Sequence, residues 1–421
     1  MEDPLTFVRS QRVSTAVVSF FRSDVAGGVV LTVAAGLALA WANSPWQHTY
    51  AQLWDHTVRL DSHQLTGFTT VREWVNGALM AVFFLVVGLE IARERRDGEL
   101  ADVRTAIVPL VGAAGGMAGA GLVYVLIVHS GPGATGWGIP MATDIAFALG
   151  ALALLGRRVP PGLRLLLLTL AVADDIGSVL VLALFYSSQT HLPALVGAAL
   201  VCVAMVVARR QGVHSAWPYL LAGVALWILL AAGGVEPALA GVVVGVLIPG
   251  GPSLDRPGPA GRLEEAIAPI SAYVVLPVFA VANAGVSIDS SILHHPGATA
   301  VFAGIVVARV VGKLGGITLA CLAVVGLGWG RLPEGVRWVH VAGGGAIAGI
   351  GFTVPLLIAE KAFSSHLQLV DVATVGLLVG SVAAFVVGAV ILTSARKLRP
   401  TADPDRGTAW RGRQRTRGET P

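Results

Sequence analysis

The stretch LLLLTLAVADDIGSVLVLALFY, residues 165–186, is long enough to cross a lipid bilayer as one helix, yet Asp174 and Asp175 stand at its middle. A membrane-spanning helix needs about 20 mostly apolar residues, and a charged carboxylate at its centre costs about 2.5–3.5 kcal/mol. Two adjacent carboxylates also repel each other. We therefore expect other parts of the chain to supply groups that offset this cost.

The composition of the whole chain is that of a protein that crosses the membrane many times. Of its 421 residues, 55% are hydrophobic and only 13% are charged, whereas soluble domains have about 25% charged residues. The net charge of +4 is spread over short connecting segments, and no finger motif or aromatic-interleaved basic face accompanies it, so we expect no nucleic-acid binding. Cys202 and Cys321 lie in apolar runs without metal-ligand spacing, which predicts neither a disulfide framework nor a zinc site.

Apolar runs of spanning length predict about twelve transmembrane helices, with both chain termini on the same side. The runs lie near residues 25–42, 71–91, 106–129, 138–156, 161–186, 193–208, 217–232, 235–249, 265–286, 299–327, 338–359 and 369–395. Of the 29 Lys and Arg residues, the alternate loops hold only Arg59, Arg72 and Lys361, while the other loops and the two ends hold nearly all the rest. The positive-inside rule then places both termini in the cytoplasm.

Three further segments surround or interrupt the predicted transmembrane domain of residues 25–395. Residues 1–24 form a cytoplasmic arm without a signal-peptide pattern, so we expect the first span to act as its own uncleaved signal. Residues 57–68, TVRLDSHQLTGF, favour a short hairpin on the outer face, with an ordered loop as the alternative. Residues 396–421 are basic, contain proline and have few aliphatic side chains, which predicts a disordered cytoplasmic tail near anionic lipid.

Away from their ends, the predicted spans contain five charged side chains. They are Asp144 in the fourth, Asp174 and Asp175 in the fifth, and Arg309 and Lys313 in the tenth. Such residues typically mark ion or proton pathways, and polar contacts or an ion pair that only hold helices together are the alternative. Since successive helical residues point roughly 100° apart, one aspartate of the pair can meet a cation on a neighbouring helix while the other faces a water-filled cavity.

Two predicted spans are interrupted near their middle by glycine and proline. The fourth contains GWGIPMATD (136–144), and the eleventh contains GGGAIAGIGFTVP (343–355). These residues indicate unwound backbone, which is tolerated at membrane depth only where protein or water satisfies it; an ordinary proline kink is the alternative. Unwinding exposes helix ends with partial charges, so by sign Asp144 suits paired helix N-termini and Lys313 suits paired C-termini.

Taken together, these stretches resemble the bacterial NhaA-type sodium/proton antiporters. The resemblance runs in order from about residue 20 to 397 and rests on ALMAVFFLVVGLEIARE (78–94), PMATDIAFALGALALLG (140–156), LAVADDIGSVLVLALFY (170–186), LPVFAVANAGV (276–286), VVGKLGGI (310–317) and AGIGFTVPLLIA (348–359). The paired aspartates, the Thr-Asp motif and the Gly-Lys motif are specific in combination. The resemblance implies an all-α polytopic membrane fold in which helices 3–5 and 10–12 are inverted repeats and helices 4 and 11 are discontinuous and cross.

The resemblance also implies roles for individual residues. It implies Asp174 and Asp175 as the ion and proton site with Thr143 and Asp144 beside it, Lys313 as the ion-pair partner of Asp174, and Glu90, Arg93 and Glu264 as a pH-responsive cluster. Na⁺ is a hard cation that prefers oxygen ligands, which Asp175, Asp174 and Thr143 can supply. A homodimer joined partly through the outer hairpin is implied as well.

The chain departs from the family pattern at three positions. Gly77 stands where many members have an acid, Glu236 stands where members often have histidine, and Arg309 lies one turn before Lys313. We expect these differences to bear on the pH at which the protein is active more than on the ion site itself.

The expected function is secondary transport in a bacterial plasma membrane: internal Na⁺ or Li⁺ is exchanged for external H⁺, electrogenically and under pH control, without a cofactor. A sodium-coupled symporter of an organic anion is an alternative, but it would need an anion-coordinating cavity. A membrane enzyme is less favoured, because neither the paired-helix acids of an aspartyl protease nor the repeated aspartates of a prenyl transferase are present. An ion channel is a further alternative, although continuous ion conduction would not need Lys313.

Overall fold

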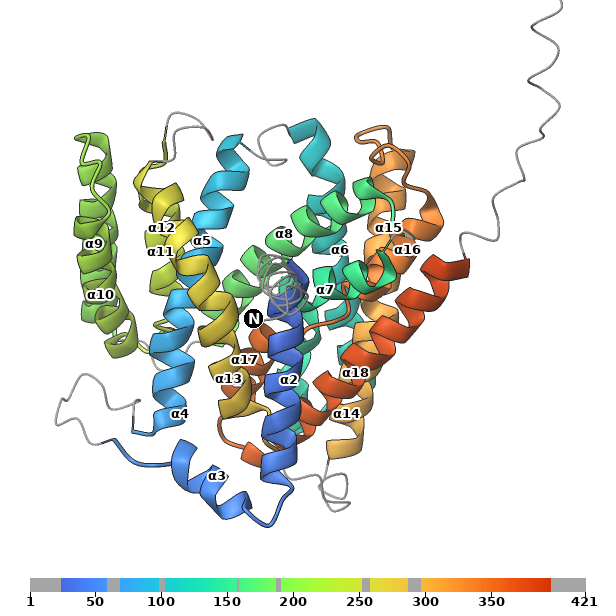
Figure 1. Cartoon of the computed structure of the whole chain (residues 1–421), viewed down its shortest axis with the longest axis horizontal. Coiled ribbons are helices and arrows are strands. Elements are labelled where there is room, and N and C mark those ends of the chain that lie inside the picture. The colour runs from blue at the N-terminus through green and yellow to red at the C-terminus, as the bar shows by residue number, and fades with distance from the viewer. Residues whose placement is uncertain are drawn as a thin grey trace, which may run out of the picture.

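The computed structural model describes residues 24–58, 69–97, 103–156, 159–186, 191–251, 258–286 and 297–394. Within these ranges the chain is a bundle of helices (Figure 1), and the one β-type pairing is an isolated antiparallel bridge between Thr57 and Thr70. Among the described residues, seven helices are long and apolar enough to cross a membrane, or eight if a bent pair counts as one span. The predicted all-α polytopic fold is confirmed, and the count of twelve spans stays a prediction.

Each predicted apolar run contains at least one helix. The uninterrupted ones are α2 (Asp24–Ala42), α6 (Val103–Ile127), α8 (Pro161–Phe185), α9 (Leu192–Arg210), α10 (Trp217–Ala232), α11 (Leu239–Leu247) and α18 (Leu367–Ser394). Outside the long helices, α3 (Gln47–Trp54) follows a sharp bend of 116° after α2. Much apolar surface on these helices faces outward, including Leu126 and Leu184 with 70% and 74% exposure, as expected for side chains in contact with lipid.

Three of the long helical segments contain a π-turn. They are α4 (Val71–Trp74), η1 (Val75–Leu79) and α5 (Met80–Asp97); α12 (Pro259–Ile270), η5 (Ser271–Val275) and α13 (Leu276–Asn283); and α14 (Ala298–Val307), η7 (Ala308–Gly312) and α15 (Lys313–Gly326). A π-turn inserts an extra residue into a helix and is frequent at functional sites. Here η7 carries Arg309 and directly precedes Lys313.

Two helices are interrupted where the sequence predicts it. Their parts are η3 (Pro132–Met141), α7 (Ile145–Leu155), α16 (Trp338–Ile347) and α17 (Thr353–Ala362). The intervening residues 142–144 and 348–352 are not helical. The first part differs from the prediction in extent and type, because it begins at Pro132 and is a 3₁₀-helix. Pro140 lacks an N–H for a helical bond to the preceding turn, which fits the interruption that follows at residues 142–144.

The helix α6 packs directly against η7 and α15 because glycines let the two backbones touch. A Cβ atom at Gly119 would lie 2.6 Å from the carbonyl oxygen of Gly312, and one at Gly316 would collide with that of Gly115. Small residues are the usual means of close helix contact in membranes. The contact encloses Lys313, which has no solvent exposure.

Three predicted segments lie wholly or partly outside the described residues. The ends of the predicted hairpin meet, because the Val58 N–H donates to the Thr69 carbonyl at 2.8 Å beside the Thr57–Thr70 bridge. Residues 59–68 between them lie outside the described residues, as do residues 1–23 of the N-terminal arm and 395–421 of the tail.

Candidate functional site

An ion pair between Asp174 and Lys313 lies at the centre of the candidate site. The Lys313 Nζ is 2.6 Å from the Asp174 Oδ2, and neither side chain is exposed. Lys313 also donates to the Thr143 Oγ1 at 3.1 Å. A buried charge is tolerated when it is paired and hydrogen-bonded, so α15 offsets the cost of placing Asp174 in α8.

Asp175 has a different environment from its neighbour. It forms no ion pair among the described residues and lines a cavity of about 570 Å³, whereas the Oδ1 atoms of both aspartates lack a hydrogen bond within the described part of the chain. Thr143, Asp144 and Thr353 line the same cavity. The structure thus separates the two carboxylates in the way that their helical spacing predicts, with one paired to a cation and the other at a cavity wall.

The two interrupted helices are hydrogen-bonded to each other at their unwound segments. The Thr143 Oγ1 donates to the Ala348 carbonyl at 2.7 Å, and the Asp144 N–H donates to the Ile350 carbonyl at 3.0 Å. These bonds satisfy carbonyl groups that unwinding leaves without helical partners, which is the condition for unwound backbone at membrane depth.

Asp144 lies at the N-terminal ends of both α7 and α17, as its charge predicts. Its Oδ1 accepts from the Phe147 N–H in the first turn of α7 at 3.4 Å, and its Oδ2 accepts from the Thr353 hydroxyl at the start of α17 at 2.8 Å. A carboxylate is stabilised at such positions by the partial positive charge of the helix N-terminus. Thr353 was not assigned a role from sequence, although its place directly after the glycine-rich interruption is a usable signal.

The carbonyl groups after α16 receive partners that the sequence did not predict. The Arg309 Nε donates to the Gly349 carbonyl at 2.8 Å. The Ser381 hydroxyl donates to the Gly351 carbonyl at 3.0 Å and accepts from the Gly351 N–H at 3.2 Å. The cation at this helix end is therefore Arg309, whereas Lys313 bonds to Asp174 and Thr143.

The three residues expected to respond to pH come together. Arg93 Nη1 is 2.5 Å from Glu264 Oε1, and Arg93 Nη2 is 3.7 Å from Glu90 Oε1. Two members of the cluster, Glu90 and Arg93, also lie on a wall of the cavity that Asp175 lines.

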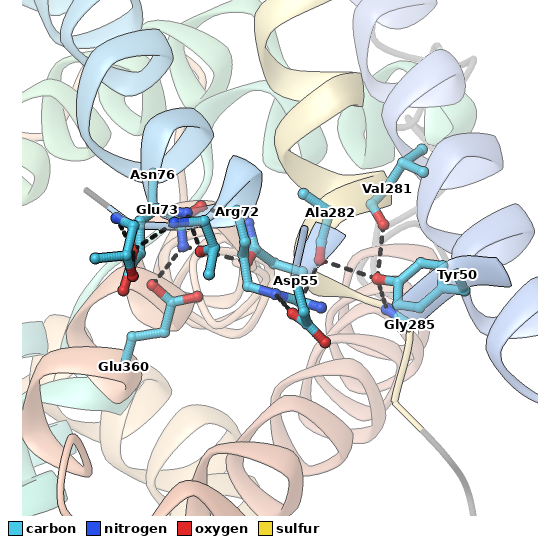
Figure 2. A network of polar contacts seen from close by, with 12 residues as sticks. Tyr50, Asp55, Arg72, Glu73, Asn76, Val281, Ala282, Gly285 and Glu360 are labelled. Atoms are coloured by element: carbon cyan, nitrogen blue, oxygen red, sulfur yellow. Dashed lines mark hydrogen bonds and ion pairs between the residues drawn. The ribbon is translucent and has the colours of Figure 1, made fainter. Parts of the chain in front are cut away.

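A second polar network lies at the opposite end of the segment Val71–Arg93 from this cluster (Figure 2). Arg72 donates to the Asp55 Oδ1 at 3.2 Å and to the Ala282 carbonyl. Asn76 donates to the Glu360 Oε2 at 2.7 Å. The network joins η1, which follows the start of this segment, to the end of α17. Sequence reasoning missed it, because Asn76 and Glu360 are far apart in the chain and neither belongs to a charged motif.

Two departures from the family pattern lie near this network. Glu236, with 6% exposure, forms an ion pair with Lys361 at 2.9 Å between Oε2 and Nζ. The Gly77 carbonyl accepts from the Trp227 indole N–H at 3.1 Å. Glu236 therefore adds a second link to α17, next to the one made by Glu360.

Comparison with known proteins bears out the resemblance. Residues 18–392 match the family model described as Na+/H+ antiporter 1. The chain is 42% identical over 380 residues to the Na(+)/H(+) antiporter NhaA of Escherichia coli, covering 88% of this chain and 95% of the relative. It is 43% identical over 386 residues to that of Mesorhizobium japonicum (89% and 94%), and 40% identical over 428 residues to the Na(+)/H(+) antiporter NhaA 3 of Frankia alni (94% and 92%). Because these matches cover nearly the whole sequence, the chain belongs to the Na+/H+ antiporter 1 family.

Proposed function

We propose that the chain exchanges internal Na⁺ or Li⁺ for external H⁺ across a bacterial inner membrane, with both termini in the cytoplasm. Membership of an antiporter family and the multiple apolar helices support a multi-pass bacterial membrane transporter rather than an enzyme. The observation that carries the proposal is Asp175, a buried carboxylate at a cavity wall beside the fixed Asp174–Lys313 pair.

The chemistry of these oxygen atoms supports exchange. A hard cation such as Na⁺ is held by carboxylate and hydroxyl oxygens, and Asp175 and Thr143 present such groups to one cavity. A proton occupies the same carboxylate oxygens, so Na⁺ and H⁺ exclude each other. The protein exchanges the two ions if its site can open to either side of the membrane in turn when it holds Na⁺ or H⁺, and cannot do so when it is empty.

We propose that the exchange is electrogenic. If more than one proton enters for each Na⁺ expelled, every cycle moves net positive charge inward. A membrane potential of 100 mV then contributes about 2.3 kcal/mol per charge, which supports roughly a fifty-fold Na⁺ gradient. Such a gradient suffices for sodium and pH homeostasis.

Regulation and assembly belong to the same proposal. Glu90, Arg93 and Glu264 are proposed to set the pH response, since they join α5 to α12 and two of them, Glu90 and Arg93, line the cavity that Asp175 also lines. We also propose a homodimer that involves residues 57–68, and contact of the basic tail with anionic membrane lipid.

The proposal is tested by measuring proton release from acidified vesicles when Na⁺, Li⁺, K⁺ or an organic anion is added. Na⁺ or Li⁺ should release protons from vesicles with the native protein. Asp175→Asn should abolish the release while the protein stays folded, because an amide cannot alternate between a proton and Na⁺. Ser178→Ala is the matched control, since this buried hydroxyl on the same helix has no hydrogen-bond partner among the described residues.

Two results would contradict the proposal. Na⁺-dependent proton release that persists in Asp175→Asn would exclude this carboxylate as the ion site. A response that needs the organic anion together with Na⁺ would favour the symporter.

A further inference from the structure

Arg309 is a buried cation that the exchange of Na⁺ for H⁺ does not by itself require. It is the largest of the fully buried residues in the described part of the chain, and it lies in η7, one turn before Lys313. An uncompensated guanidinium at this depth is costly, and such residues are usually functional. The surroundings of Arg309 show what compensates its charge.

Glycines make room for this side chain. A Cβ atom at Gly351 would lie 2.6 Å from the Arg309 Nη2, and one at Gly380 would lie 3.1 Å from its Cδ. A Cβ at Gly349 would collide with the Arg309 carbonyl oxygen. The unwound segment and α18 thus have glycines at the positions where a larger residue would crowd the Arg309 side chain.

Arg309 belongs to a complete set of donors for the unwound segment. The carbonyl groups of residues 348–351 accept, in order, from the Thr143 hydroxyl, the Arg309 Nε, the Asp144 N–H and the Ser381 hydroxyl. Arg309 is the charged member of this set. It therefore places a positive charge where the carbonyl end of α16 carries partial negative charge.

The guanidinium also lies close to the other interrupted helix. The position of a Gly351 Cβ has as its three nearest neighbours the Arg309 Nη2, the Ala142 carbonyl oxygen and the Asp144 nitrogen. Arg309 also lies one turn before Lys313, which pairs with Asp174, and Asp175 follows Asp174 in α8. Two cations and three carboxylates thus share one buried region.

We propose that Arg309 is a positioning residue of the ion site, which supplies the positive charge at the unwound segment and leaves Lys313 to pair with Asp174. This inference rests on the proposed function of Asp174 and Asp175. Without the charge of Arg309, Lys313 is the cation nearest to the carbonyl groups after α16 and is drawn away from Asp174. The carboxylates also face one positive charge fewer, so each holds its proton more strongly.

Three variants separate the charge from the hydrogen bond. Arg309→Gln keeps an amide that can donate to Gly349 but removes the charge, and Arg309→Lys keeps the charge. Ser381→Ala removes an uncharged donor from the same segment. In vesicles, Arg309→Gln should need a pH about one unit higher for half-maximal exchange, while the other two should keep the native pH profile.

The affinity for Na⁺ gives a second readout. At alkaline pH, Arg309→Gln should show an unchanged or lower KM for Na⁺ with a several-fold lower maximal rate, because the more negative site releases Na⁺ more slowly. A role limited to holding the backbone would instead raise KM in Arg309→Gln and Ser381→Ala alike, with no shift in pH profile, and would overturn the inference. Equal shifts in Arg309→Gln and Arg309→Lys would overturn it too.

A second neutral variant covers the case in which Arg309→Gln does not fold. Arg309→Met removes the charge without burying an unpaired polar group, and should shift the pH profile in the same direction; an unshifted profile would refute the role of Arg309. Asp175→Asn is measured in the same assay. Exchange that survives in Asp175→Asn refutes the ion site, whereas an inactive Asp175→Asn together with an unshifted Arg309→Gln refutes only the present inference.

Discussion

At the scale of single residues, the Asp174–Lys313 pair explains how two adjacent carboxylates are tolerated inside a membrane helix. The ammonium group is 2.6 Å from Asp174 and 3.1 Å from the Thr143 hydroxyl, so each charge has a fixed partner. Since Asp174 Oδ1 and Asp175 Oδ1 both lack a hydrogen bond among the described residues, the ion pair is what distinguishes the two carboxylates. Asp174 is paired with a cation, whereas Asp175 lines the cavity and is the carboxylate that we propose for the ion.

Removing one member of this pair should destabilise the protein. Lys313→Gln leaves the Asp174 carboxylate buried without a counter-charge, and breaking a buried pair in this way costs about 3–5 kcal/mol. Adding Asp174→Asn removes that uncompensated charge and should restore much of the lost stability. The measurement is the melting temperature of the purified single and double variants in detergent.

The same double variant shows whether the ammonium proton is carried. If the pair only stabilises the fold, the double variant should still exchange ions, and exchange should still respond to an imposed voltage. If Lys313 releases a proton as Na⁺ binds, exchange should become electroneutral. A native melting temperature in Lys313→Gln, with voltage-driven exchange intact, would rule out the pairing as described.

At the scale of elements, glycines decide how closely the helices around the ion pair approach. In α15, a Cβ at Gly316 would collide with the Gly115 carbonyl, whereas Gly315 has open space on its Cβ side. These adjacent positions have the same helix propensity and differ only in the surface they face. The close contact of α6 and α15 therefore depends on one of the two glycines.

Alanine at these two positions should have opposite effects. Gly316→Ala should force the two backbones apart, lower the melting temperature and reduce exchange, because Lys313 lies between them. Gly315→Ala should be neutral or slightly stabilising, since alanine favours a helix over glycine by about 1 kcal/mol. Equal melting temperatures for the two variants would show that the contact tolerates separation.

Much of this arrangement could be predicted from sequence, and the remainder depends on tertiary contacts. Glycine and proline indicated both interruptions, and the sign of its charge placed Asp144 at paired helix N-termini. The donors at Gly349 and Gly351 could not be predicted, because Arg309 and Ser381 reach them from other helices. The sequence around Arg309 and around Ser381 contains no pattern that predicts which carbonyl group each side chain reaches.

At the scale of the whole molecule, the cavity and the polar network lie toward opposite ends of the bundle. Glu90 and Arg93 line the cavity with Asp175, whereas Arg72 belongs to the network at the other end of the segment Val71–Arg93. In Figure 1 this segment runs from α4 at the bottom of the view to the end of α5 at the top. The cavity that Asp175 lines therefore extends toward the Arg93 end of this segment.

Two polar links join the Arg72 end of the bundle to α17. Asn76 bonds to Glu360 at 2.7 Å, and Glu236 pairs with Lys361 at 2.9 Å. Both links run from elements outside the interrupted helices to the last turn of α17. The helix α17 begins at Thr353, which touches Asp144. When the ion site opens to the other side of the membrane, the accompanying movement of α17 should therefore break both links.

A covalent bridge in place of one link should therefore stop exchange. Joining Asn76→Cys to Glu360→Cys with a short thiol cross-linker should hold the Arg72 end closed, and reduction of a cleavable linker should restore activity. Asn76→Cys with Asn283→Cys is the matched control, because these two side chains also bond to each other, at 2.7 Å, but join η1 to α13 and leave α17 free. The cross-linked control should still exchange Na⁺ for H⁺. Exchange at the native rate in the bridged Asn76–Glu360 pair would show that α17 keeps its contact with η1 throughout the cycle, and that the site opens to the Arg72 end by another route.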